Sequence, residues 1–285
     1  MNPSPAEQQG PPRVTALIIT RNSAPQLREC LEALERSEDR ERLEIVVVDN
    51  GSTDGSGEIP HDFPEVQSLR LPKDFGWTKA ANIGMRTAKG TLIFFLPPHV
   101  VVKPDTIQRL ASKLEESDII GGVYPFVDRW FRMPNAEALA AACRTGELPG
   151  ASAPPADAES VAVDYAPGAP IMVRKIFLRG MNYFDERFGD AWSDLDLCWQ
   201  LRNAGKTILL LPQIRVQYGT PSPAGQDTAH QADRTVGAAA YLAKRFGAVA
   251  GMKFRFAAVL QALVRAQFPR ASALVSGQKV DGTQT

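Results

Sequence analysis

Residues 91–103, TLIFFLPPHVVVK, hold two apolar runs that are separated by Pro97-Pro98-His99. The first run, Leu92–Leu96, is short and rich in branched and aromatic side chains, which predicts a fully buried strand. Proline cannot donate a ladder hydrogen bond, so we expect this strand to stop at Pro97. The break places His99 at the carboxyl edge of a sheet, where open α/β sheets bind their ligands.

The rest of the chain alternates apolar strands with amphipathic helices. Further strands are expected at Val14–Thr20, Leu43–Val48, Val66–Leu71, Asp118–Tyr124, Val161–Tyr165, Ala169–Arg174, Thr207–Leu211 and Arg215–Tyr218. Helices are expected from Pro25 to Ser37, from Trp77 to Ala88, and from Pro104 to Glu116. This alternation predicts an α/β fold with a mainly parallel central sheet, helices on both faces, and additional C-terminal helices.

The composition changes along the chain and suggests four parts. Residues 1–12 are polar and proline-rich, which predicts a disordered tail, and residues 13–225 form the α/β domain. Residues 226–270 are expected to form a helical extension, and residues 271–285 a flexible tail. Within the α/β domain, residues 125–160 break the alternation and have the character of an insertion that covers a site.

The charge balance gives no reason to expect a nucleic-acid partner. The chain has 32 Lys and Arg residues and 32 Asp and Glu residues, so its formal net charge is zero. The three cysteines, Cys30, Cys143 and Cys198, form no CxxC pair, which favours a reducing compartment over a disulfide framework. No run of 18 apolar residues is present, so no membrane-spanning segment is expected. The expected location is the cytoplasm.

The C-terminal region is basic although the whole chain is neutral. From residue 231 onward, eight Lys and Arg residues are accompanied by only two carboxylates. The stretch KFRFAAVLQALVRAQF, residues 253–268, is apolar with basic residues interspersed. One interpretation is a helix in peripheral contact with the inner face of a membrane. The other is a helix packed on the domain with its arginines in solvent.

Asp49 ends an apolar run and is followed by the turn Asn50-Gly51-Ser52. A carboxylate in this place can receive a base or ribose, and the turn can offer backbone N–H groups to phosphate. The alternative is a plain turn, because Asn-Gly is a strong turn dipeptide. No G-x-G-x-x-G sequence occurs, which argues against a dinucleotide site.

A second candidate is the acidic sequence Ser193-Asp194-Leu195-Asp196. Ser193 and Asp196 have the spacing of a capping box, which would explain the cluster by a structural role. In the other interpretation, Asp194 points into a cleft as a general base that deprotonates an acceptor hydroxyl. His99 likewise either satisfies a local carbonyl, or acts as a ligand of a divalent ion or a neutral partner of a diphosphate.

Four stretches occur together in a characteristic order and spacing: residues 14–23 (VTALIITRNS), 45–56 (IVVVDNGSTDGS), 76–90 with Asn82, and 188–205, which contains SDLDLCWQLRNAG. In these stretches the chain resembles glycosyltransferase family 2, the inverting sugar transferases of the GT-A fold. The resemblance covers residues 13–220 and is greatest to the rhamnosyltransferase-like branch of the family.

The resemblance implies roles for particular residues. Asp194 is implied as the catalytic base, with Asp196 and Arg202 supporting it and with Trp192 and Gly168 shaping the acceptor side of the cleft. A nucleotide-sugar donor is implied to lie among Thr20, Asn22, Asp49, Asn50, Ser52, Lys79 and Asn82.

Several positions depart from the family's pattern. Family members hold a divalent cation, Mn²⁺ or Mg²⁺, with an Asp-x-Asp or Asn-x-Asp signature, but Pro97-Pro98-His99 fills that slot here. Gln217 and Tyr218 stand where the family often has a histidine, and Arg21 where an aromatic residue is usual. His99 is the candidate metal ligand that remains. A neutral histidine adds no charge and prefers softer metals than Mg²⁺, so weak or absent metal dependence is expected.

Two functions remain open at this point. The first is an inverting glycosyltransferase that moves a sugar from a nucleotide-sugar donor to a hydroxyl of a glycan, a lipid or a polysaccharide precursor of the cell envelope. The second is a catalytically impaired relative that binds nucleotide or glycan without turnover. The retained Asp194 favours the first function, and the altered metal signature favours the second.

Overall fold

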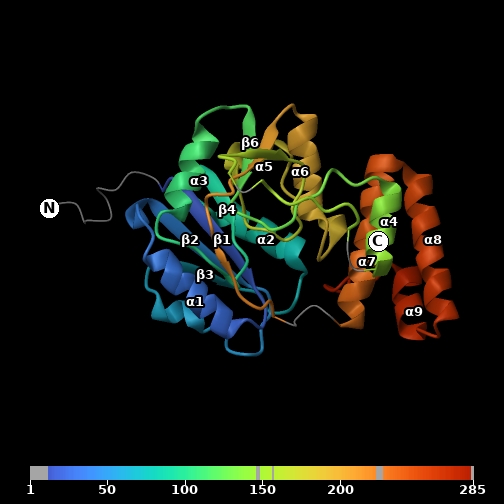
Figure 1. Ribbon diagram of the computed structural model, residues 1–285. Helices are drawn as coiled ribbons and strands as arrows, with labels where there is room; N and C mark the ends of the chain where they lie inside the picture. Colours follow the sequence, from blue (N-terminus) through green and yellow to red (C-terminus); the bar gives the residue numbers. More distant parts are fainter. Residues whose placement is uncertain (1–11, 146–147, 156, 223–226, 284–285) are drawn as a thin grey trace.

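The structure is a computed structural model that describes residues 12–145, 148–155, 157–222 and 227–283. An α/β body is joined to a C-terminal group of helices at one end (Figure 1). The disordered tail predicted over residues 1–12 falls outside the described residues except for its last position.

The central sheet of the described chain has eight strands and is mainly parallel, as the sequence predicts. Its spatial order is β3 (Val66–Arg70), β2 (Leu43–Asp49), β1 (Val14–Thr20), β4 (Leu92–Phe95), β8 (Ile171–Arg174), β6 (Ile120–Tyr124), β9 (Thr207–Leu210) and β7 (Val161–Val163). Strands β8 and β7 run antiparallel to their neighbours. The parallel register places Thr20 of β1 beside Asp49 of β2, at the carboxyl edge of the sheet.

Helices cover both faces of the sheet, which confirms the predicted layers (Figure 1). Alternate residues of each strand face opposite sides, so each strand supplies two cores. One core packs α1 (Ala24–Glu35) and α3 (Thr106–Glu115) against the sheet. The other packs α2 (Trp77–Thr87) and α6 (Ser193–Asn203) against the opposite face. Short helices lie between these elements: η2 (Arg40–Arg42), η3 (Ile59–Asp62), α5 (Lys175–Gly180) and η4 (Glu186–Phe188).

The central strand β4 ends where its prolines predict. Its last residue is Phe95, and the amide of Leu96 still donates to the carbonyl oxygen of Leu17 at 3.0 Å. A tight turn follows, in which the Val100 amide donates to the Pro97 carbonyl oxygen at 3.0 Å. The second apolar run then forms β5 (Val100–Val101), which pairs with β10 (Gln217–Tyr218) in a separate antiparallel ribbon.

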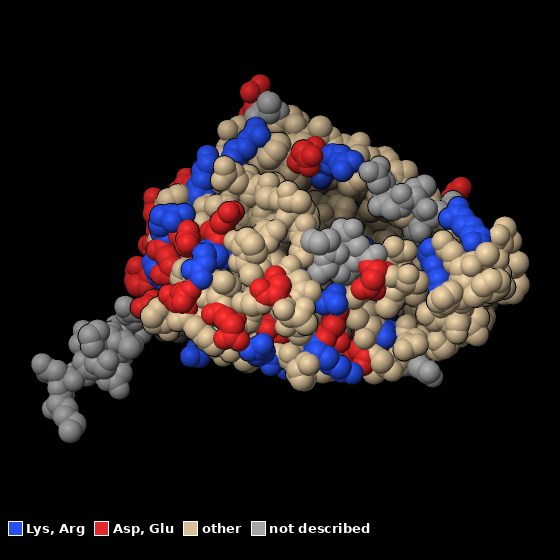
Figure 2. All heavy atoms as spheres, turned by 90° about the horizontal axis from the view of Figure 1, so that it is seen from below, with Lys and Arg blue, Asp and Glu red and all other residues tan. Residues whose placement is uncertain are grey.

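The C-terminal unit consists of α7 (Thr228–Phe246), α8 (Ala248–Val264) and α9 (Phe268–Ser276). The inserted helix α4 (Ala136–Thr145) packs against α7. The break between α7 and α8 falls at Gly247, whose φ of 94° suits glycine. The surface of this unit, at the right of Figure 2, is mostly uncharged, whereas acidic and basic side chains are mixed on the body.

The chain after residue 270 differs from the expected flexible tail. Helix α9 continues to Ser276, and its Ala271 and Leu274 are buried. Beyond it, the Val280 amide donates to Asp233 of α7 at 3.3 Å. The Val280–Asp233 hydrogen bond could not be seen in the composition of the segment, because it joins residues 47 positions apart.

Candidate functional site

The ends of β1 and β2 present two buried oxygen atoms without a hydrogen-bond partner among the described residues. They are Thr20 Oγ1 and Asp49 Oδ2, and both side chains are fully buried. Asp49 Oδ1 is satisfied by the Ser52 amide at 3.0 Å, and Arg70 Nε lies 3.7 Å from Oδ2. An unpaired buried polar atom costs free energy, so two of them side by side indicate a place where a ligand supplies the missing partners.

Three other residues that were predicted to bind the nucleotide sugar, Asn22, Asn50 and Ser52, use their polar atoms to join loops. Asn22, in the left-handed region at φ 48°, accepts from the Thr53 amide at 2.8 Å, while its own amide donates to Ser52 Oγ at 3.0 Å. Asn50 Nδ2 donates to Asp74 at 2.7 Å, and Asn50 Oδ1 accepts from the Phe75 amide at 2.9 Å. Asn22, Asn50 and Ser52 therefore shape the edge at which Thr20 and Asp49 lie.

Asn82 lies deeper in α2 and clamps the segment before η4. Its side-chain oxygen accepts from the Phe184 amide at 3.0 Å, and its Nδ2 donates to the Phe184 carbonyl at 2.9 Å and to Glu186 at 3.1 Å. The side chain is 2% exposed. Its amide is already satisfied on both sides, so its role in the described structure is to hold α2 against the segment that leads to α6.

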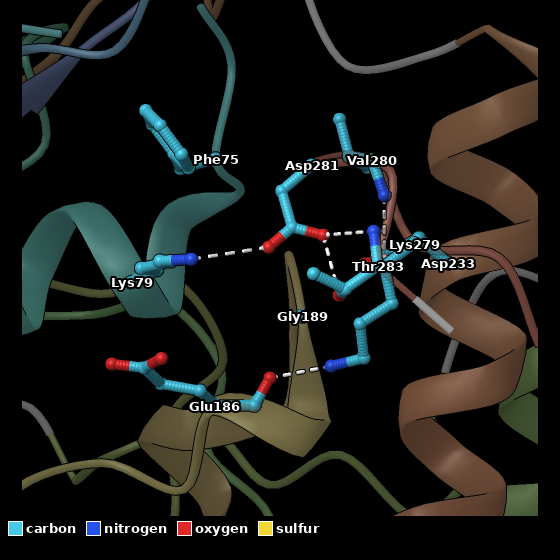
Figure 3. Close-up of a pocket in the computed structure, with 9 residues that line it drawn as sticks. All are labelled: Phe75, Lys79, Glu186, Gly189, Asp233, Lys279, Val280, Asp281 and Thr283. Carbon is cyan, nitrogen blue, oxygen red and sulfur yellow. Dashed lines mark hydrogen bonds and ion pairs between the residues drawn. The ribbon is translucent and has the colours of Figure 1, made fainter. Parts of the chain in front are cut away.

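Lys79, predicted to face the donor, instead meets the end of the chain. Its Nζ lies 3.4 Å from the Asp281 carboxylate and 4.9 Å from the centre of the Phe75 ring. These residues line a small cavity of about 90 Å³ together with Gly189 and Lys279 (Figure 3). In Figure 3 Asp281 reaches across the cavity toward Lys79, so the C-terminal segment supplies the ion-pair partner of the lysine.

Asp194 sits in the first turn of α6 with its carboxylate held in a fixed orientation. Its Oδ2 accepts from the Tyr165 hydroxyl at 3.0 Å and from the Gly168 amide at 3.1 Å. Its Oδ1 accepts from the Leu195 amide at 2.8 Å. The predicted neighbour Gly168 is thus in contact with Asp194 through its backbone. Tyr165 is a contact that the sequence patterns did not identify.

The protonation of this group is set by burial. Burial raises the pKa of the Asp194 carboxyl, and the donated hydrogen bonds from Gly168, Leu195 and Tyr165 oppose that rise. Burial also raises the pKa of Tyr165 well above its usual value, so its hydroxyl stays protonated and donates. A carboxylate whose pKa is raised toward working pH is a better proton acceptor than an ordinary surface aspartate.

Hydrogen bonds join the start of α6 to the start of α2, so Asp194 in the first turn of α6 is held close to α2. Ser193 Oγ lies 2.6 Å from Thr78 Oγ1, and the Thr78 amide donates to the Gly189 carbonyl at 3.2 Å. The predicted capping box is therefore wrong: Trp192 is the N-cap residue and no side chain caps this helix. Ser193 was assigned to the cap from spacing alone, but its hydroxyl bonds to a neighbouring helix.

Trp192 is tied to the C-terminal unit. Its backbone has a φ of 77°, and its indole Nε1 donates to the Arg234 carbonyl at 2.8 Å. The ring packs against the core rather than standing free. Trp192, two residues before Asp194, therefore joins the start of α6 to α7.

Asp196 and Arg202 do not touch Asp194 in the described structure. Asp196 is 1% exposed and pairs with Lys244 at 3.2 Å and with Arg245, both from α7. Arg202 pairs with Asp164 at 2.6 Å, next in the chain to Tyr165. Asp196 thus holds α6 to α7, and Arg202 steadies the strand end that carries Tyr165.

His99 follows the prolines at the end of β4 and is half-buried. Burial lowers the pKa of its imidazole, so the ring is neutral at working pH. Its carbonyl oxygen accepts from the Gly219 amide at 2.7 Å, which joins this turn to the end of β10. Across the residues that the structure describes, no group of three or more His, Cys, Asp and Glu side chains could hold a metal ion. The side chains at this strand end therefore do not fit a Mn²⁺ or Mg²⁺ site.

His230 is a site residue that the sequence patterns missed. It comes from the first turn of α7, is 3% exposed, and lies between two carboxylates. Its Nε2 is 2.8 Å from Asp74 and its Nδ1 is 2.9 Å from Asp227. Arg21 Nε lies 3.0 Å from the same Asp74 oxygen, so the loop after β1 and the C-terminal unit meet at Asp74.

This cluster balances Arg21 and His230 against the carboxylates of Asp74 and Asp227. Burial alone lowers the pKa of His230, but the hydrogen bonds to Asp74 and Asp227 outweigh it and raise that pKa. Nε2 also lies 2.9 Å from Arg21 Nη1, so Arg21 and His230 both approach Asp74 and each other. Asp227 is also the N-cap of α7, a signal that could have pointed to the His230 amide.

The family comparison agrees with this geometry. The family model described as Glycosyl transferase family 2 matches residues 15–177, which is more than half of the chain. The chain belongs to glycosyltransferase family 2. The matched part contains the ends of β1, β2 and β4, and it stops before α6 and the C-terminal unit.

Curated glycosyltransferases match part of the chain. Glycosyltransferase GlyG of Streptococcus pneumoniae is 31% identical over 120 residues, which is 40% of this chain and 40% of GlyG. The pre-mycofactocin glycosyltransferase of Mycobacterium tuberculosis is 25% identical over 210 residues, which is 72% of this chain and 42% of that protein. The chain thus spans less than half the length of these relatives.

Solved structures show that the fold is the GT-A fold expected from the sequence. Staphylococcus aureus TarS 1–349 in complex with UDP has a TM-score of 0.56 at 18% identity, covering 79% of this chain and 65% of that one. The mannosyltransferase PcManGT from Pyrobaculum calidifontis, in complex with GDP-Man and Mn²⁺, has a TM-score of 0.57 at 18% identity. That match covers 96% of this chain and 83% of PcManGT, so it extends over the C-terminal helices as well.

Proposed function

We propose that this family 2 protein is an inverting glycosyltransferase with Asp194 as its general base. The observation that carries the proposal is the Asp194 carboxylate, held by Tyr165, Gly168 and Leu195 and given a raised pKa by burial. The Ser193–Thr78 contact fixes it next to α2, whose preceding loop bonds to Asn50 at the end of β2. Asp194 is therefore linked to the end of β2 through α2 and the loop before it.

The proposed reaction is a single displacement at the anomeric carbon. The acceptor oxygen forms a bond to that carbon while its proton passes to the Asp194 carboxylate. The bond from the anomeric carbon to the diphosphate oxygen breaks, and its electron pair leaves with the nucleoside diphosphate. Attack from the side opposite the leaving group inverts the configuration. Tyr165 and Gly168 hold one carboxylate oxygen, so the group keeps its orientation while it accepts the proton.

The donor is proposed to be a nucleotide sugar whose base is read by Thr20 and Asp49. Asp49 Oδ2 lacks a hydrogen-bond donor and suits a base N–H group, and the neighbouring Thr20 hydroxyl suits an acceptor or donor beside it. The TarS and PcManGT structures contain UDP and GDP-Man, so both kinds of nucleotide occur on this fold. Arg21 and His230 lie at the same edge, where both pair with Asp74.

The acceptor is proposed to be a hydroxyl of a glycan, a lipid or a polysaccharide precursor of the cell envelope. Residue Phe131 of the inserted segment exchanges backbone hydrogen bonds with Tyr165, so the insertion lies beside the proposed base. A cytoplasmic location and contact of the C-terminal helices with the inner face of the membrane belong to this proposal. A structural relative, PcManGT, holds Mn²⁺, but the side chains around His99 give no equivalent ligand set, so weak or absent metal dependence is proposed.

Replacing the proposed base tests the function. Asp194→Asn keeps the size of the side chain but replaces one accepting oxygen by an NH2 donor and removes the proton acceptor, so kcat should fall by about a thousandfold or more. Nucleotide affinity, measured by calorimetry, should stay close to that of the parent protein. Asp105→Asn, an exposed carboxylate before α3, is the matched control and should have parental activity. Full activity in Asp194→Asn would remove Asp194 from the mechanism.

The second function, binding without turnover, makes a different prediction. A panel of UDP-, GDP- and dTDP-sugars would then include at least one tight binder and no donor that is consumed. The absence of a carboxylate pair after β4 favours this alternative, and the orientation of Asp194 argues against it.

A further inference from the structure

Helix α8 is apolar on its exposed face as well as on its packed face. Its packed side buries Gly251 and Ala262 in contacts with α7 and α9. Its exposed side carries Val249, Met252, Phe256, Leu260, Leu263 and Val264. Phe256 is 68% exposed and Val264 is 84% exposed. A helix that is apolar all round belongs in a protein core or in lipid, and here one side has no protein against it in the described structure.

The exposed apolar residues form one continuous stripe. Positions 249, 252, 256, 260 and 263 are three or four residues apart, which is the spacing of neighbours on one face of a helix. Phe268 and Val275 of the adjoining helix α9 are exposed to a similar degree, at 65% and 67%. We call these exposed residues of α8 and α9 the α8 face. Apolar surfaces of this size on a folded chain mark an interaction site.

Helices α8 and α9 themselves carry charge of a single sign. Residues 234–280 contain eight Lys and Arg residues and no Asp or Glu. Lys253 and Arg265 are exposed, and neither has a carboxylate within 4.0 Å among the residues that the structure describes. Figure 2 shows the same end of the molecule as mostly tan with blue side chains, in contrast to the mixed charges of the body.

We propose that the α8 face binds the surface of an anionic lipid membrane. The apolar stripe would enter the boundary between head groups and acyl chains, and Lys253 and Arg265 would meet the lipid phosphates. The helix lies in the membrane plane in this arrangement. Within the described ranges, no helix is long and apolar enough to cross a bilayer.

A second copy of the chain is a poorer occupant of this face. A symmetric dimer through the α8 face would bring the Lys253 and Arg265 side chains of both copies to one interface, and neither α8 nor α9 contains a carboxylate to pair with them. An anionic bilayer supplies both the apolar phase and the opposite charge.

The inference also narrows the proposed acceptor. If the proposed transfer reaction is correct, a protein held at a membrane surface by α8 would meet an acceptor that is itself anchored in that membrane, so the acceptor class becomes a lipid-linked hydroxyl. This step rests on the proposed function, whereas membrane binding itself does not require turnover. Vesicle binding and transfer activity can therefore fail separately.

The test is flotation of the full chain with vesicles of phosphatidylglycerol and phosphatidylcholine, compared with phosphatidylcholine alone. The parent protein should float with the anionic vesicles. The triple variant Met252→Ser, Phe256→Ser, Val264→Ser should lower the partition coefficient by about tenfold or more, because three apolar side chains no longer leave water. Ile176→Ser is the matched control, since Ile176 of α5 is also 68% exposed but lies on the body, and it should bind as the parent does.

A charge variant and a mass measurement complete the test. Lys253→Glu with Arg265→Glu should lower binding to anionic vesicles by about fivefold or more per charge, and added salt should weaken parental binding. Retention of the circular dichroism spectrum and melting temperature shows that each variant folds. Parental protein that stays with the lipid-free fraction at low salt would overturn the proposal. So would a concentration-dependent dimer in sedimentation that the triple serine variant abolishes, because the face would then be an interface between copies.

Discussion

The carboxyl ends of β2 and β4 lie on either side of β1 and carry opposite chemistry. The end of β2 holds Asp49, a buried carboxylate with one oxygen unpartnered, beside the unpartnered Thr20 hydroxyl of β1. The end of β4 holds Pro97-Pro98-His99, which offers one half-buried neutral imidazole. One strand end is ready to receive a polar ligand, and the other lacks the anionic oxygens that a hard divalent cation needs.

The contrast separates nucleotide recognition from cation binding, two tasks that the family resemblance implies together. Recognition of the nucleotide needs hydrogen-bonding atoms at the ends of β1 and β2, and these are present. Holding a cation at the diphosphate needs carboxylates after β4, and these are replaced. The basic side chains near the ends of β1 and β2 are Arg21 and His230, and both pair with Asp74. The following changes break or sharpen this separation, beginning with the largest expected effect.

Replacing Asp49 should damage the intact strand end most. In Asp49→Asn an N–H group can take the place of the unpartnered oxygen, so nucleotide affinity should fall by about 10- to 100-fold, as for the loss of a charged hydrogen bond. Calorimetry with UDP, GDP and dTDP measures the change. The exposed Asp105→Asn variant should bind like the parent protein, and equal binding by Asp49→Asn would mean that this carboxylate does not contact the nucleotide.

Crowding the same carboxylate should have a smaller effect. A Cβ atom on Gly57 would lie 2.5 Å from Asp49 Oδ2, so Gly57→Ala must displace that oxygen. Nucleotide affinity is expected to fall by about fivefold, within the range of overpacking effects. Gly180→Ala is the control, because a Cβ there meets nothing within 4 Å. If Gly57→Ala binds nucleotide as tightly as Gly180→Ala, the position of Oδ2 is unimportant.

The pH dependence of stability tests the ion pairs of His230 with Asp74 and Asp227. The pKa of His230 is raised in the folded protein, so the folded state holds its proton more tightly than the unfolded state does. The stabilisation is complete below the ordinary histidine pKa of about 6.5 and is lost as pH rises through the raised value. Denaturant unfolding between pH 6 and 8 should show stability falling with pH, and His230→Gln should flatten that fall. An unchanged slope in the variant would contradict a charged His230.

The smallest effect is expected at the end of β4. His99→Ala removes a neutral side chain that has no hydrogen-bond partner drawn from the described residues, so nucleotide affinity should change by less than about twofold. The variant should also melt within a few degrees of the parent protein, since the ring is half-buried. A tenfold or greater loss of nucleotide affinity would make His99 part of the donor site.

Much of the fold could be predicted from the sequence because its signals are local. The apolar runs at β1, β2 and β4 and the prolines after Phe95 specify strands and their ends within a few residues. The turn after Asp49 and the sequence around Asp194 are assigned to the candidate site by their resemblance to a family, and these assignments stay predictions.

Contacts between distant segments could not be predicted in the same way. Asn82 bonds to Phe184, Asp196 pairs with residues of α7, and His230 reaches Asp74, 156 positions earlier in the chain. Nothing in the spacing of these residues shows which side of a helix meets which neighbour. The same limitation explains the wrong capping box at Ser193 and the unforeseen packing of the chain after residue 270.

The central claim is that the nucleotide is recognised at the ends of β1 and β2 without a cation held at the end of β4. Titration calorimetry of the parent protein with UDP, GDP and dTDP, first with EDTA and then with MnCl₂, tests it most directly. The account predicts that the nucleotide that binds best does so with the same affinity in both conditions, within about twofold. Binding that is about tenfold or more tighter with Mn²⁺, and that loses this gain in His99→Ala, would contradict it.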